Sequence, residues 1–249
     1  MDRPGISAIA HTDHPIAAPL GDDSVHALLD RALPHGDARL LDLGCGSGAW
    51  MLRAQTSRPG LRAEGVDNAP ETLAAARCAL TDAGCGDRSV LHAQDAAEFT
   101  SPHRYDVVLS VGATHAFGGL LPTLEAARTH LAPGGGVLLG ACFWEREPGR
   151  ATLDSGFAAE DFDDLATTVD RITADGWTPL HGHVSTLQEW DDYEWSWTGS
   201  LSRWALEHPE HPDSGQALKA AADHRAAWLH GYRGTLGFVT LLLHRTTRP

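Results

Sequence analysis

The chain has little of three things that mark common protein classes: positive charge, cysteine and long apolar stretches. Its 249 residues hold 19 lysines and arginines against 33 aspartates and glutamates, a formal net charge of −14. This balance argues against a nucleic-acid partner and an anionic membrane surface, because both favour a basic face. No apolar run approaches the ~18 residues that span a bilayer. The N-terminus also lacks the charged-then-apolar pattern of a secretory signal.

The four cysteines, Cys45, Cys78, Cys85 and Cys142, include no C-x-x-C pair. This spacing predicts reduced thiols in a cytoplasmic protein and argues against a disulfide framework or a zinc site. No internal repeat or low-complexity linker interrupts the chain, and its length suits one α/β domain over residues 1–249.

A glycine-rich stretch directly after an apolar run is the most informative motif. Residues 38–43 are typical of a buried strand, and Asp42 is followed by Gly44, Gly46 and Gly48. Glycines let the backbone turn tightly and approach a ligand closely. The spacing G-x-G-x-G differs from the dinucleotide fingerprint G-x-G-x-x-G and lacks the lysine of a P-loop. An acidic residue here suits a ligand with an amino group and a positive centre, such as S-adenosylmethionine (SAM).

Four more strand-like segments follow, and helical patterns separate several of them. The predicted strands are residues 61–67, 90–95, 105–111 and 131–139. Apolar helical spacing over residues 120–131 and an alanine-rich run over 70–80 predict helices, and such alternation predicts a parallel sheet. Asp67 ends the second strand at about the spacing from the glycines at which a carboxylate reaches a ribose. It could also cap the helix that begins near Pro70.

The ordered set D-L-G-C-G-S-G, V-D, D-A, Y-D-V-V-L-S and L-A-P-G-G-G, within residues 36–143, resembles the class I SAM-dependent methyltransferases. The resemblance implies an α/β fold with a doubly wound, mostly parallel seven-stranded sheet and a terminal antiparallel pair. It also implies a lid at 1–35, a SAM-binding core at 36–150 and a C-terminal half at 151–249. A helical insert at about 186–233, before the last strand, exceeds the minimal family fold.

The same resemblance implies SAM as the cofactor and assigns its contacts. Asp42 and the glycine loop would lie along the methionine part, Asp67 would bind the ribose hydroxyls, and Asp95 would lie beside the adenine amino group. The full set of expected cofactor-binding residues is Asp42, Gly44, Cys45, Gly46, Gly48, Asp67, Asn68, Asp95, Ala96, Val111 and Gly112.

The loop after the fourth predicted strand carries the candidate catalytic residue, His115, with glycines on both sides. A histidine titrates near neutral pH and can take a proton from a nucleophile. The alternative is a structural histidine bonded to backbone. His181 and His183 alternate on one strand face, but no third ligand is identifiable, so we expect no metal site.

Candidate acceptor-binding residues come from segments outside the core motifs. The N-terminal segment is too rich in proline and small residues to predict a helix, and its histidines could face the site. The aromatic, acidic run in the insert could wall a pocket, although its helical stripe is also typical of packing. The candidates are His11, His14, Phe117, Trp144, Glu145 and Trp195.

The resulting hypothesis is methyl transfer from SAM to a small-molecule acceptor by in-line displacement, in which positioning supplies much of the acceleration. Two alternatives remain at this point: an enzyme of the same fold with non-methylating chemistry, and a non-catalytic SAM-binding protein.

Overall fold

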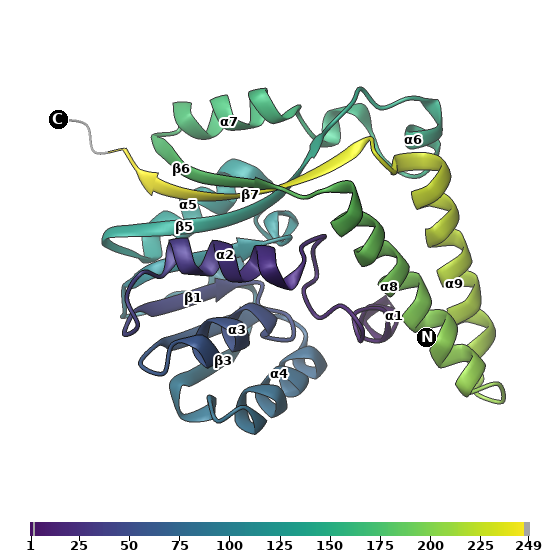
Figure 1. Ribbon diagram of the computed structural model, residues 1–249, viewed down its shortest axis with the longest axis horizontal. Coiled ribbons are helices and arrows are strands. Elements are labelled where there is room, and N and C mark those ends of the chain that lie inside the picture. The colour runs from purple at the N-terminus through teal and green to yellow at the C-terminus, as the bar shows by residue number, and fades with distance from the viewer. Residues whose placement is uncertain (2, 247–249) are drawn as a thin grey trace. The chain divides into compact units, whose positions relative to one another are not determined.

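A seven-stranded sheet with the order β3-β2-β1-β4-β5-β7-β6 organises the computed structural model, which describes residues 1 and 3–246 (Figure 1). The strands are β1 (Arg39–Leu43), β2 (Arg62–Asp67), β3 (Ser89–Ala93), β4 (Tyr105–Val111), β5 (Leu131–Trp144), β6 (Trp177–Val184) and β7 (Leu236–Arg245). The pairs among β1 to β5 are parallel, whereas β6 and β7 are antiparallel. This confirms the predicted mostly parallel, doubly wound fold.

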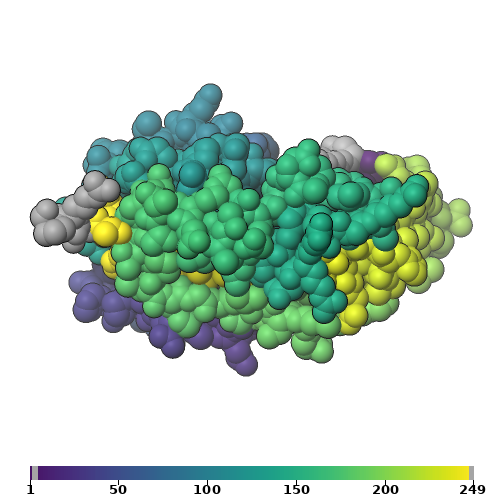
Figure 2. Space-filling view, turned by 90° about the horizontal axis from the view of Figure 1, so that it is seen from above, coloured from purple at the N-terminus to yellow at the C-terminus, as the bar shows by residue number. Residues whose placement is uncertain are grey.

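Three helices connect parallel strands, as the alternating pattern predicted: α3 (Ala49–Ser57), α4 (Pro70–Asp82) and α5 (Leu120–His130). Helix α2 (Asp22–Ala32) precedes β1, and α7 (Leu165–Ala174) leads into β6. The helix α4 begins at Pro70, whose fixed φ suits a first helical position, and Gly84 follows its end with φ +69°. With β6, α7 forms the green surface at the centre of Figure 2.

The central strands are buried because helices cover them. In β4, Val107, Val108, Leu109 and Ser110 are each at most 2% exposed, as expected for a parallel strand packed on both faces. Among the described residues, no helix combines the length and the hydropathy needed to cross a membrane.

The chain forms two compact units, which are described separately. The sheet unit comprises Gly21–Ala141, Ala166–Val184 and Val239–Pro249, and the helical unit comprises Met1–Leu20, Cys142–Leu165 and Ser185–Phe238. The predicted N-terminal segment 1–35 is therefore divided, whereas the predicted insert falls within the helical unit. The description of the chain as one domain stays a prediction.

The helical unit is built from α1 (Arg3–Ala10), α6 (Arg150–Asp154), α8 (Leu187–Glu207) and α9 (Ser214–Ala227), followed by the π-helical turn η5 (Trp228–Tyr232). Helix α1 packs on α8, and Ile6, Ile9 and Ala10 join the apolar cluster around Leu201. The expectation of no helix therefore holds for residues 11–19 but not for Arg3–Ala10, where tertiary packing outweighs low helix propensity. An ion pair of 2.6 Å between Asp13 and Arg203 continues this contact.

Before α7, the chain forms a short 3-10 turn, η4 (Ala159–Asp161).

One close approach fixes the shape of the glycine loop. Gly44 has φ +83°, and a Cβ added to it would lie 2.5 Å from the Cβ of Ala113, in the loop after β4. Real Cβ atoms do not come so close, so any larger residue at position 44 must push the two loops apart.

We expect Gly44→Ala to destabilise the protein more than Gly118→Ala. Gly118 has nearly the same φ, +81°, but a Cβ added there would meet no atom within 4 Å, so its substitution costs only about 1–2 kcal/mol for the left-handed backbone. Overpacking at position 44 adds about 1–3 kcal/mol. Urea denaturation measures both, and the double mutant Gly44→Ala, Ala113→Gly should recover the excess. Equal losses in the two single mutants would contradict the steric argument.

Candidate functional site

The candidate cofactor site lies at the carboxyl ends of β1, β2 and β4 in the sheet unit. Gly44, Gly46 and Gly48 have φ of +83°, +52° and +71°, so all three use the left-handed region. The amides of Gly44 and Cys45 donate to the carbonyl of Val66 at 2.9 and 3.0 Å. The loop therefore curls over the end of β2.

The carboxylate of Asp67 holds this loop in place. Its Oδ2 accepts the Gly46 amide and its Oδ1 accepts the Ala69 amide, each at 2.9 Å. Ala69, not Asp67, is the N-cap of α4, so the capping interpretation of Asp67 was wrong. A carboxylate has about four acceptor positions. Two of them therefore remain for ligand hydroxyls.

Asp42 is a buried acid without an internal partner for one of its oxygens. The residue is 2% exposed, and Oδ2 has no hydrogen-bond partner among residues 1 and 3–246. Desolvation, and secondarily the negative charge of Asp67, raise the pKa of Asp42 to about 7. A carboxylate in this position is stabilised by a cation, and the ammonium group of SAM is one. The residues present thus fit the cofactor that the sequence predicts.

The other predicted cofactor residues lie at the same edge of the sheet. Asn68 is exposed beyond the end of β2. Asp95 is exposed after β3, and its Oδ1 accepts the Ala97 amide at 2.9 Å, while Ala96 is buried. Their contacts with the cofactor stay predictions.

The loop after β4 presents His115 to solvent. Beyond Val111 the backbone turns at Gly112, with φ +75°, into the 3-10 helix η3 (Thr114–Phe117). The His115 ring is exposed and makes no hydrogen bond within the described part of the chain. The alternative of a ring bonded to backbone therefore finds no support, although a catalytic role stays a prediction. Phe117 is half-buried at the end of the same turn.

In the helical unit, Tyr193 brings the two N-terminal histidines together. His11 Nδ1 donates to the Ser7 carbonyl at 2.8 Å, so its Nε2 accepts from the Tyr193 hydroxyl at 3.2 Å. Burial lowers the pKa of His11 and raises that of Tyr193, so both are neutral near pH 7. His14 contacts the Tyr193 ring edge-on at 5.3 Å, and its Nδ1 donates to the Ile16 carbonyl at 2.7 Å.

The remaining acceptor candidates do not share one place. Trp144 is buried between Phe157 and Phe162, and its indole N–H donates to the Ala159 carbonyl at 2.9 Å. Its polar atom is therefore already used by the protein.

Glu145 is exposed, and Trp195 is 52% exposed and packs edge-on against Trp228. Neither belongs to the cluster around Tyr193, so their roles in acceptor binding stay predictions.

Sequence reasoning missed a buried polar network beside that cluster. Glu194 is 2% exposed and accepts from His224 at 2.6 Å and from the Tyr232 hydroxyl at 2.7 Å. The ring of His224 is stacked on Trp197 at 3.8 Å. Glu194 lies within the aromatic run, but no local signal points to His224 or Tyr232, because they are distant in the chain.

Comparison with known proteins agrees with this geometry. Residues 41–137 match the family described as "Methyltransferase domain". The crystal structure of a SAM-dependent methyltransferase from Thiobacillus denitrificans with S-adenosylhomocysteine is similar at a TM-score of 0.88. It has 26% sequence identity and covers 98% of this chain and 100% of that chain. These similarities support a class I SAM-dependent methyltransferase.

Two relatives extend the similarity. The uncharacterized protein YjhP of Escherichia coli is 28% identical over 84% of this chain and 86% of its own length. A trans-aconitate 2-methyltransferase of Streptomyces avermitilis is 36% identical over 51% of this chain and 46% of its own length. The matching methyltransferase domain and the neighbour's S-adenosylhomocysteine complex support SAM as the cofactor of this methyltransferase.

The buried Asp42 generates a pH prediction. A cation beside a carboxyl group lowers its pKa, so SAM binding should release a proton from the fraction of Asp42 that is protonated in the free protein. Because the pKa of Asp42 is raised to about 7, affinity should increase from pH 5.5 to 7, by up to about tenfold per pH unit. Calorimetry in two buffers of different ionisation enthalpy measures both effects.

The control is Asp42→Asn, which keeps the shape of the side chain and cannot titrate. It should bind SAM more weakly at pH 7 and show no proton release. A wild-type affinity that is flat with pH would remove Asp42 from the cofactor contacts.

Proposed function

We propose that this methyltransferase acts on a small-molecule acceptor by in-line displacement. The formal charge of −14 disfavours a nucleic-acid acceptor. Two relatives bear names with small-molecule acceptors: the trans-aconitate methyltransferase and a ubiquinone biosynthesis O-methyltransferase of Cereibacter sphaeroides, which is 35% identical over 43% of this chain. The observation that carries the proposal is the buried Asp42 carboxylate beneath a glycine loop that leaves no room for a side chain at Gly44.

When bound, SAM supplies a methyl group on a sulfonium centre. The chain's own residues then have three tasks. Asp42 compensates the positive charge of SAM. Asp67 accepts from the ribose hydroxyls while it holds the loop, and Asp95, after the end of β3, lies beside the adenine amino group. These tasks are binding and orientation, which supply much of the rate in a displacement that needs no general acid on the leaving group.

A base is needed only when the acceptor begins protonated. His115 suits this role because its ring is exposed, unbonded within the described residues and placed after the strand β4, beside the carboxyl edge. A neutral imidazole there can accept the acceptor's proton or orient its lone pair.

The test of the function is product formation. The purified protein, incubated with SAM and a panel of small carboxylic acids, phenols and amines, should form S-adenosylhomocysteine together with a methylated acceptor, both detected by mass spectrometry. Turnover of an acceptor without S-adenosylhomocysteine would favour non-methylating chemistry. Tight SAM binding with no product across the panel would favour a binding protein.

We expect His115→Ala to lower the methyl-transfer rate while SAM affinity stays near that of the wild type. Loss of a general base costs typically 10²–10⁴-fold, whereas loss of an orienting hydrogen bond costs less, so the size of the decrease separates the two roles. The matched control is His103→Ala, an exposed histidine before the opposite end of β4, which should keep full activity. Full activity of His115→Ala would make this ring dispensable.

A further inference from the structure

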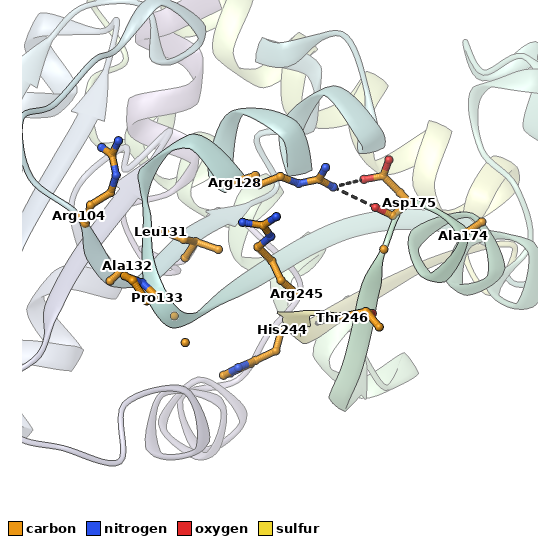
Figure 3. Close-up of a pocket in the computed structure, with 13 residues that line it drawn as sticks. Arg104, Arg128, Leu131, Ala132, Pro133, Ala174, Asp175, His244, Arg245 and Thr246 are labelled. Atoms are coloured by element: carbon orange, nitrogen blue, oxygen red, sulfur yellow. Dashed lines mark hydrogen bonds and ion pairs between the residues drawn. The ribbon is translucent and has the colours of Figure 1, made fainter. Parts of the chain in front are cut away.

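A hollow, separate from the candidate cofactor site, lies at the edge of the sheet unit opposite the glycine loop. It measures about 1020 Å³ and is formed where β4 and β5 begin, where α7 turns into β6, and where β7 ends. Figure 3 shows the turn Leu131–Gly135 with Arg104 on one side and Arg245 on the other. The strand β4 (Tyr105–Val111) separates this edge from the cofactor edge by about 20 Å, at ~3.3 Å per residue.

The lining of this hollow is basic in an acidic protein. Among the described residues that line it are Arg104, Arg128, Arg245 and His244, together with one carboxylate, that of Asp175. The Oδ2 of that carboxylate accepts from Arg128 at 2.7 Å and from the Trp177 indole at 3.1 Å. Asp175 therefore compensates Arg128, and neither Arg104 nor Arg245 forms an ion pair with it.

Arg128 is a fixed wall of the hollow. Its guanidinium also donates to the Asp175 carbonyl at 3.0 Å and lies 5.3 Å from the centre of the Trp177 ring. Its Nε is buried and has no acceptor among the described residues. The side chain thus keeps a donor that the protein does not use.

Arg104 and Arg245 have no carboxylate partner in the part of the chain that the structure describes. Arg104 donates only to the backbone carbonyl of the preceding residue, at 3.3 Å. The pKa of His130 is lowered, mainly by burial and secondarily by the positive charge of Arg104. The hollow thus brings together two arginines without a carboxylate partner among the described residues, whereas Arg53 and Arg58 pair with aspartates.

Glycines shape the floor between them. A Cβ on Gly135 would lie 2.9 Å from the Tyr105 carbonyl, and one on Gly136 would lie 2.8 Å from Nε2 of His244. The His244 ring is thus held against bare backbone, at the rim of the hollow. These two positions therefore have no room for a side chain, and glycine lets β5 run close to β4 and β7.

We propose that this hollow binds a small phosphate-bearing anion, at a site separate from the cofactor site. Guanidinium groups recognise phosphate oxygens through paired, charge-assisted hydrogen bonds, and Arg104 and Arg245 supply two such groups from different chain segments. A concave floor suits a compact anion better than an extended polyanion.

The test uses the whole protein and inorganic pyrophosphate as the probe, at an ionic strength held constant with sodium chloride. Calorimetry should show saturable binding to the wild type, and the melting temperature should rise with pyrophosphate because the ligand binds only the folded state. The double variant Arg104→Gln, Arg245→Gln should weaken this binding at least tenfold. Its SAM affinity should be unchanged, because the two edges are distinct.

The matched control is Arg31→Gln, Arg150→Gln, which removes the same charge from two other exposed positions and should bind pyrophosphate within twofold of the wild type. Equal weakening in both double variants would show general charge attraction, and absence of saturable binding to the wild type would overturn the proposal.

Citrate as a second probe separates phosphate recognition from attraction of any trianion. Citrate binding without pyrophosphate binding would also overturn it. If the double variant does not fold, each single variant should weaken binding severalfold and answers the same question.

Discussion

The bond between the Asp67 carboxylate and the amide of Gly46, 2.9 Å long, is the contact on which the candidate cofactor site depends. It ties the loop after β1 to the end of β2, while the second oxygen of the same carboxylate ties the start of α4. Gly44 is then brought so close to Ala113 that the loops after β1 and β4 fit only without a side chain. One side chain thereby connects the ends of several strands at a single edge.

Charge is distributed unevenly over the sheet unit. The carboxyl edge carries acidic residues. Burial there raises the pKa of Asp42, and a positively charged ligand beside it would lower that pKa again. The amino edge carries arginines, and the nearby carboxylate of Asp175 accepts from Arg128 and from the Trp177 indole. The two edges of the sheet therefore suit ligands of opposite charge: a cation at the buried acid and an anion at the arginines.

Much of the sheet and of the loop could be predicted because their signals are local. The run before Asp42, the glycine spacing and the strand-final Asp67 all lie within one connected stretch, and backbone sterics alone dictate glycine at positive φ. Which residue caps α4 could not be read from the sequence, because the Asp67 carboxylate bonds both to the loop after β1 and to Ala69, the residue that takes the N-cap position.

Other features depend on contacts between distant segments, which periodicity does not encode. Helix α1 contains a proline and a glycine and forms because it packs on α8, almost 200 residues later. The network of Glu194 with His224 and Tyr232 joins residues 30 and 38 positions apart. The arginines of the hollow at the amino edge likewise come from segments that only the strand order brings to one edge.

The division into units has a consequence for anyone who wishes to handle them separately. Each unit is assembled from three stretches of chain that alternate with those of the other, and the strands β5 and β7 each begin in one unit and end in the other. No single cut separates the two units, because every fragment that contains one unit whole also contains part of the other. Independent expression of the helical unit therefore requires its three segments to be joined by new linkers.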